Sequence, residues 1–123
     1  DLVVSNACKT YINGGYIGNI YLDNSAHCEI INADVDSIYT ESWNNSNLTV
    51  GEGSHVKKVV MNAYLARIFV NDDAIIDELD LTKITKTYVN RISIADTATV
   101  TKIVDGELTF TTLQAWKDWK TSV

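Results

Sequence analysis

Apolar residues recur along this chain in a spaced pattern, in which one apolar residue is followed three positions later by a second and two positions after that by a third. Four copies of the pattern lie 18, 21 and 20 residues apart and begin at Ile17, Val35, Val56 and Ile76. A second set falls between these copies and begins at Leu65 and Val89. A degenerate repeat of about 20 residues is typical of solenoid proteins, in which each coil is stable only when it stacks on its neighbours.

The residues between the apolar positions favour short strands joined by tight corners. Val, Ile, Thr and Tyr dominate residues 17–110, and Asn or Asp interrupts them every few residues. Residues 20–28, 68–76 and 92–100 align with one another as strand, corner and strand, with Asn or Asp at each bend and Ala two positions later. We therefore predict an all-β fold, a single-stranded right-handed parallel β-helix over residues 17–110, in which these corners are equivalent.

A β-sandwich is the alternative, because it also contains many short strands separated by turns. Asn-Gly and Asp-Gly turns, which commonly close hairpins, occur only at Asn13-Gly14 and Asp105-Gly106. The chain contains no proline, which suits stacked strands whose backbone N–H groups must donate to a neighbour. Both observations favour the β-helix.

The two ends of the chain depart from the repeat. Residues 1–16 contain a strong break at Asn13-Gly-Gly15, and we expect an irregular N-terminal coil or cap there. Residues 111–123 place apolar side chains at helical spacing after Thr112, a potential N-cap, so we expect a short helix that caps the β-helix or serves as a linker. Because the chain opens directly on strand-like residues, we also expect it to be a segment of a longer protein.

Charge and hydropathy exclude several classes of partner. The 123 residues carry a formal net charge of −6, and the ten basic residues are scattered, with Lys57-Lys58 the only adjacent pair. Nucleic-acid binding requires clustered cations, so we expect no nucleic-acid partner. No apolar run in the sequence approaches the roughly 18–20 residues needed to cross a bilayer, so we expect no membrane insertion.

The sequence contains no recognised catalytic motif, and we assign no catalytic residue, no metal site and no cofactor. His27 and Cys28 are adjacent on an expected strand and point to opposite faces, so they are poorly placed to share a metal ion with Cys8. Cys28 is expected to act as a small buried apolar residue. Acidic residues stacked on neighbouring coils, Asp72 and Asp73 among them, leave open a carboxylate pair for glycoside cleavage, although a solvated polar face is the simpler interpretation.

Outward aromatic side chains are the candidate binding residues. Tyr21 and Tyr39 occupy equivalent positions in successive copies of the pattern, and we expect Phe69 at the same position of a third. Trp43 lies in a polar stretch that interrupts the repeat. Such rings bury surface against another copy of the chain, support flat sugar rings, or stack on one another across coils. Self-association is the interpretation that we favour.

Residues 17–31, 35–50 and 65–79 combine Asn or Ser corners, strands of the Ile-Tyr-Leu type and inward Ala or Cys. In this style of repeat the chain resembles the right-handed β-helices of phage tail-fibre, tailspike and baseplate proteins. The resemblance implies a homotrimer in a virion, or at another extracellular or cell-surface location, that contacts a bacterial surface glycan.

We therefore expect a non-enzymatic virion structural or receptor-binding module that presents a rigid β-helical surface. Two alternatives stay open. The first is a fragment of a carbohydrate-active β-helix, a polysaccharide hydrolase or lyase, which would use stacked carboxylates. The second is a segment of a bacterial surface adhesin. The coils vary in length and no catalytic acid pair can be assigned, so the structural or adhesive role is favoured.

Overall fold

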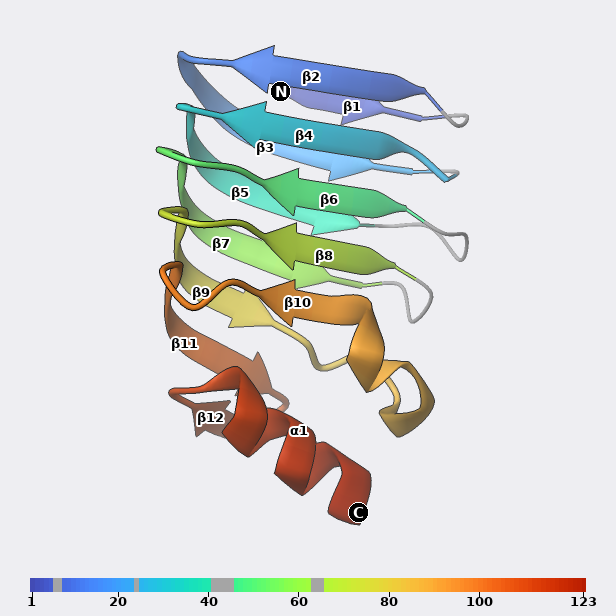
Figure 1. Ribbon diagram of the computed structural model, residues 1–123. Coiled ribbons are helices and arrows are strands. Elements are labelled where there is room, and N and C mark those ends of the chain that lie inside the picture. Colours follow the sequence, from blue (N-terminus) through green and yellow to red (C-terminus); the bar gives the residue numbers. More distant parts are fainter. Residues whose placement is uncertain (6–7, 24, 41–45, 63–65) are drawn as a thin grey trace.

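The computed structural model describes residues 1–5, 8–23, 25–40, 46–62 and 66–123. The chain forms a β-solenoid of about five turns with a short helix at its C-terminal end (Figure 1). Two sheets run along the solenoid, and the strands from β1 to β11 alternate between them. The predicted all-β solenoid is confirmed, and the pervasive parallel pairing excludes an antiparallel sandwich.

The larger sheet, called the long sheet below, contains in spatial order β1 (Leu2–Val4), β3 (Tyr16–Leu22), β5 (Asp34–Thr40), β7 (His55–Met61), β9 (Ile75–Asp80), β11 (Thr99–Asp105) and β12 (Leu108–Phe110). The short sheet contains β10 (Ile92–Ile94), β8 (Arg67–Val70), β6 (Asn47–Val50), β4 (His27–Ile31) and β2 (Lys9–Asn13). Neighbouring strands in both sheets are parallel, except that β12 runs antiparallel to β11.

The copies of the apolar pattern that begin at Ile17, Val35, Val56 and Ile76 are neighbouring strands of the long sheet, and equivalent residues of these copies pair with one another. The four starting residues pair in sequence, Ile17 with Val35, Val35 with Val56 and Val56 with Ile76. One position per strand is left out of these pairings, namely Gly18, Asp36, Lys57 and Asp77. Each strand therefore makes the same irregular step after its first inward residue, which explains why two residues rather than one separate the first two apolar positions. Because every coil makes this step at the same place, the strands stay in register.

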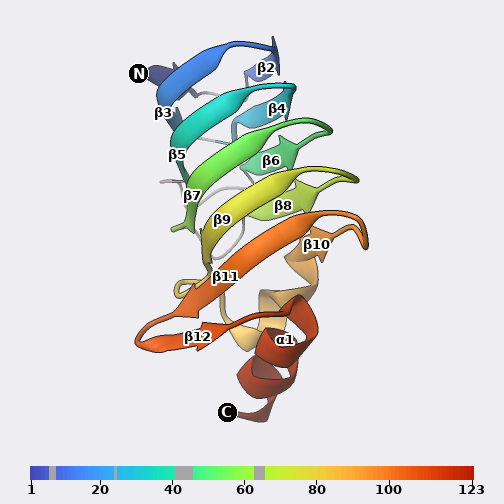
Figure 2. The same cartoon turned by 90° about the vertical axis from the view of Figure 1, so that its left-hand side faces the viewer.

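Figure 2 shows the strands of the two sheets stacked along the solenoid. Apolar side chains from both sheets fill the space between them. In the long sheet, one inward column has no exposed surface and consists of Ile20, Ile38, Val59 and Leu79. The facing column of the short sheet is almost as fully buried and consists of Cys28, Leu48, Ile68 and Ile92. Each coil thus buries its apolar face against the coils on either side, as the repeat predicts.

The corners that the sequence aligned are not all equivalent. Residues 68–76 and 92–100 both cross from the short sheet to the long sheet and lie in register, as predicted. Residues 20–28 instead cross from β3 in the long sheet to β4 in the short sheet, so that part of the alignment is wrong. Both kinds of corner require a left-handed backbone, with φ of 64° at Ser25 and 61° at Asp73. Turn chemistry therefore identifies a corner without specifying the side of the coil on which it lies.

The first sixteen residues are more regular than expected. β1 extends the long sheet by pairing with β3, and β2 extends the short sheet by pairing with β4. The break at Asn13-Gly-Gly15 is the corner between β2 and β3, where Gly14 and Gly15 have φ of 87° and 86°. The described part of residues 1–16 thus forms a first turn of the solenoid.

The C-terminal end has a different architecture. A 3-10 helix, η1 (Lys86–Arg91), precedes β10, and β12 folds back on β11 through a tight turn at Gly106, where φ is 62°. The helix α1 (Leu113–Ser122) follows and lies against η1 and β12. The Thr112 side chain accepts a hydrogen bond from the Ala115 N–H at 3.1 Å, which confirms the predicted N-cap and helix. No helix in the described ranges is both long and apolar enough to span a membrane.

A buried polar contact ties α1 to the end of the solenoid. Trp116 is fully buried, and its indole N–H donates to the Asp105 carboxylate at 3.0 Å. The Lys120 ammonium donates to the same carboxylate oxygen at 2.7 Å. The side chains of Lys120 and Asp105 are 13% and 8% exposed, so water screens this ion pair only weakly. The contact should therefore determine whether α1 stays attached.

We predict that Asp105→Asn loosens α1, because the amide leaves the shielded Lys120 ammonium without a counter-charge. The expected loss in free energy of unfolding is up to about 3–5 kcal/mol, measured by chemical denaturation with tryptophan fluorescence. Glu107→Gln is the matched control, since Glu107 is exposed in the same hairpin. Adding Lys120→Met to Asp105→Asn should restore part of the loss. Equal stability of the Asp105 and Glu107 variants would contradict this account.

Candidate functional site

Tyr21 and Tyr39 lie in one outward column of the long sheet, as predicted. They pair in register, and their rings stack across neighbouring coils with centroids 5.4 Å apart and an interplanar angle of 13°. The next two positions of the column are Val60 and Asp80, so the aromatic column contains two rings over these coils. Both rings are half-buried. Part of their surface is therefore used in contact with each other.

Phe69 does not continue this column, and that prediction is wrong. It lies on the outer face of the short sheet, where it pairs with Thr49 on one side and Ser93 on the other. Its exposed fraction is 38%. The two sets of the repeat form different sheets, and similar apolar spacing in both made them indistinguishable in the sequence. Trp43, the remaining aromatic candidate, lies outside the described residues.

Ionic contacts cover the outer face of the long sheet. Each lysine in its strands faces a carboxylate at 3.4 Å, and the pairs are Lys57 with Asp36, Lys58 with Glu78, and Lys102 with Glu78. His55 contacts Asp77 at 2.8 Å. The Tyr16 hydroxyl donates to Asp36, and this hydrogen bond lowers the pKa of Asp36 and raises the pKa of Tyr16. The face therefore satisfies most of its charges internally.

The acidic residues considered for catalysis lie on two different parts of the coil, a corner and the long sheet. Asp72 and Asp73 are exposed at the corner after β8, where the Thr97 hydroxyl donates to Asp72 at 2.9 Å. Asp77 and Glu78 lie on the outer face of the long sheet in the ion pairs described above. In the part of the chain that the structure covers, no group of three or more His, Cys, Asp or Glu side chains is arranged to hold a metal ion.

The outer face of the short sheet carries two neighbouring columns of a different kind. We call the first the basic column, and it consists of Lys9, His27, Asn47 and Arg67, paired in register on β2, β4, β6 and β8. We call the second the mixed column, and it consists of Tyr11, Glu29, Thr49 and Phe69 on the same strands. Each strand thus contributes one residue to each column. Tyr11 is 73% exposed, more than any other large apolar or aromatic side chain in the described ranges.

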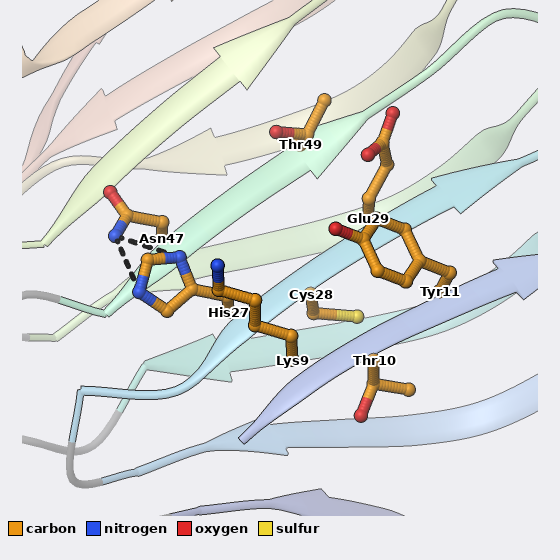
Figure 3. A pocket seen from close by; sticks show the side chains of 8 residues that line it. All are labelled: Lys9, Thr10, Tyr11, His27, Cys28, Glu29, Asn47 and Thr49. Carbon is orange, nitrogen blue, oxygen red and sulfur yellow. Dashed lines mark hydrogen bonds between the residues drawn. The ribbon is translucent and has the colours of Figure 1, made fainter. Parts of the chain in front are cut away.

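Two shallow hollows lie over these columns. One hollow of about 140 Å³ is lined by Lys9, Thr10, Tyr11, His27, Cys28, Glu29, Asn47 and Thr49 (Figure 3). A second hollow is lined by Ser25, His27, Asn47 and Arg67. The two hollows share His27 and Asn47, and their lining residues extend over the strands from β2 to β8. The name "trough" is used below for the residues of the basic and mixed columns on these four strands, all of which line one of the two hollows except Phe69, which continues the mixed column on β8.

The centre of the trough is held by a contact between side chains. The Asn47 amide nitrogen lies 3.2 and 3.3 Å from the two ring nitrogens of His27 (Figure 3). Lys9, Glu29 and Arg67 take part in no ion pair within the described residues, in contrast to the lysines of the long sheet. The trough therefore combines a fixed polar centre with unpaired charges.

Sequence reasoning missed most of the trough. His27 was considered only as a metal ligand, and Phe69 was assigned to the other sheet. The available signal was spacing, because the basic column has intervals of 18, 20 and 20 residues, which are close to the 18, 21 and 20 of the apolar repeat. Polar residues that recur at the same spacing as the core residues pair in register on neighbouring coils, so they form one column on the outer face.

The two cysteines differ in a way that can be measured. Cys8 is exposed, whereas Cys28 is 3% exposed and burial raises the pKa of its thiol to about 11. Because the thiolate is the reactive form, we predict that one thiol reacts with Ellman's reagent at pH 8 in the native chain and two react after denaturation. The Cys8→Ser variant should show none in the native state. Rapid reaction of native Cys8→Ser would contradict the burial of Cys28.

Comparisons with known proteins gave no match among protein-family models, curated proteins or solved structures. The residues described above therefore carry the functional conclusion.

Proposed function

We propose that this chain is a non-enzymatic structural or receptor-binding module of the kind found in phage tail fibres and spikes, and that it presents the trough to a surface glycan. The observation that supports this most is the contrast between the two outer faces. The long sheet pairs its lysines with carboxylates, whereas Lys9, Glu29 and Arg67 of the short sheet form no ion pair with any residue that the structure describes and lie beside the exposed ring of Tyr11. Unpaired polar groups on an ordered surface are suited to a ligand.

The ordered backbone of the solenoid favours ligand binding. All strands that carry trough residues are paired in the short sheet, so little conformational entropy is lost when a ligand settles on them. Aromatic rings, hydroxyls, amides and charged groups side by side are the groups that recognise sugars, since a sugar has both apolar ring faces and many hydroxyls. The separation of the carboxylates between a corner and the long sheet gives no support to the hydrolase or lyase alternative.

The first test is retention without cleavage. We predict that the purified chain is retarded in native gels containing bacterial surface polysaccharide, and that the polysaccharide gains no new reducing or unsaturated ends. Dextran serves as the neutral control. A fall in polymer length would instead support the carbohydrate-active alternative. Absence of retention by every surface polysaccharide, together with absence of binding to whole cells, would contradict the proposed function.

The resemblance to tail-fibre proteins also leads us to propose a homotrimer. Light scattering coupled to size exclusion should then give three times the protomer mass of 13.7 kDa. The half-buried pair of Tyr21 and Tyr39 is the contact that we propose, so Tyr39→Ser should lower the mass and Tyr11→Ser, on the other sheet, should not. A monomeric native chain would contradict the proposed trimer. The glycan-binding proposal would then be tested separately by retardation in the polysaccharide gels.

A further inference from the structure

We propose that the trough binds an extended acidic polysaccharide, with Lys9 and Arg67 each holding a sugar carboxylate and Tyr11 and Phe69 each supporting a sugar ring. This inference rests on the proposed function, because it names the class of ligand that the binding module takes. It goes beyond that function by assigning residues and charge.

The arrangement of the two columns carries the inference. β2 contributes Lys9 and Tyr11, and β8 contributes Arg67 and Phe69. Each end of the trough therefore has one cation beside one partly or fully exposed ring. The two strands between them place polar residues in the same columns, namely His27 and Glu29 on β4, and Asn47 and Thr49 on β6. The same pair of groups is thus presented twice with hydrogen-bonding groups in between, as a repeating polymer would require.

The spacing of these groups suits a sugar chain that lies along the solenoid. Neighbouring strands are about 4.8 Å apart, so Lys9 and Arg67 are separated by roughly 14 Å. One strand spacing is similar to the length of one hexose in an extended polysaccharide, so successive sugars would meet successive strands. In Figure 3, Lys9 extends toward His27, whereas Tyr11 and Glu29 occupy the other side of the hollow. A carboxylate at Lys9 would therefore be kept apart from Glu29.

Charge complementarity favours an acidic sugar over a neutral one. Arginine and lysine bind carboxylates through charge-assisted hydrogen bonds, and neither Lys9 nor Arg67 has a carboxylate partner in the described residues. The net charge of −6 repels a polyanion from the molecule as a whole, so binding would depend on these two local cations. A nucleic acid would present a phosphate at each nucleotide and would need more clustered cations than this face offers.

The inference can be tested with polygalacturonate, alginate and hyaluronate as probes, and with carboxyl-reduced polygalacturonate as the neutral polymer of the same backbone. Affinity is measured by native affinity electrophoresis and by calorimetry. The native chain should bind at least one acidic probe. Lys9→Gln and Arg67→Gln should each weaken that binding by about tenfold or more, as expected for the loss of a charge-assisted hydrogen bond, and Tyr11→Ala should weaken it as well.

The matched control is Lys57→Gln, which removes the same charge from a lysine that is already paired on the long sheet. It should change affinity less than twofold, and circular dichroism should show that all variants keep the native fold. Equal losses in the Lys57, Lys9 and Arg67 variants would overturn the inference, because they would indicate non-specific attraction. Equal binding of the carboxyl-reduced polymer would also overturn it while supporting the proposed glycan-binding function. If none of the three acidic probes binds, the inference fails, and retention by neutral surface polysaccharide decides the proposed function separately.

Discussion

Parallel stacking of coils in one register is the constraint on which the rest of this structure depends. Each strand of the solenoid interior uses its backbone groups on both neighbouring strands, and each inward apolar residue lies directly over its equivalents. A change of register by one residue would move every inward side chain of a strand to the solvent face. The irregular step at Gly18, Asp36, Lys57 and Asp77 survives because all coils share it.

The same register organises the outer faces. A side chain has neighbours about 4.8 Å away on the coils before and after it, so charges and rings align in columns whether or not they attract. On the long sheet these columns became ladders of ion pairs and a stacked pair of tyrosines. On the short sheet each column contains side chains of different types, and these side chains form no ion pair within the described residues. The functional conclusion follows from this difference between two faces of one scaffold.

The sequence was sufficient to predict the solenoid, the long-sheet register and the C-terminal helix with Thr112 as its N-cap. These features depend on local residue type and on spacing, which are both visible in one chain. It was insufficient to assign Phe69 to the correct sheet, because the two sheets carry similar apolar repeats and similar corners. The sequence also could not predict the contact of Asp105 with Trp116 and Lys120. These residues meet only because the helix α1 packs against the hairpin of β11 and β12. Most of the trough was missed because no single segment contains it.

The most direct test of the stacked coils is residue-resolved amide hydrogen exchange of the native chain by NMR. In a parallel strand, alternate amides donate to opposite neighbours. An interior strand should therefore protect nearly all its amides, and an edge strand only every second one. We predict slow exchange throughout β5, β7 and β9, and alternating fast and slow exchange in the edge strands β1 and β2. Alternating exchange in β5, β7 and β9 would mean that these strands lack a neighbour on one side, and would contradict the stacked solenoid.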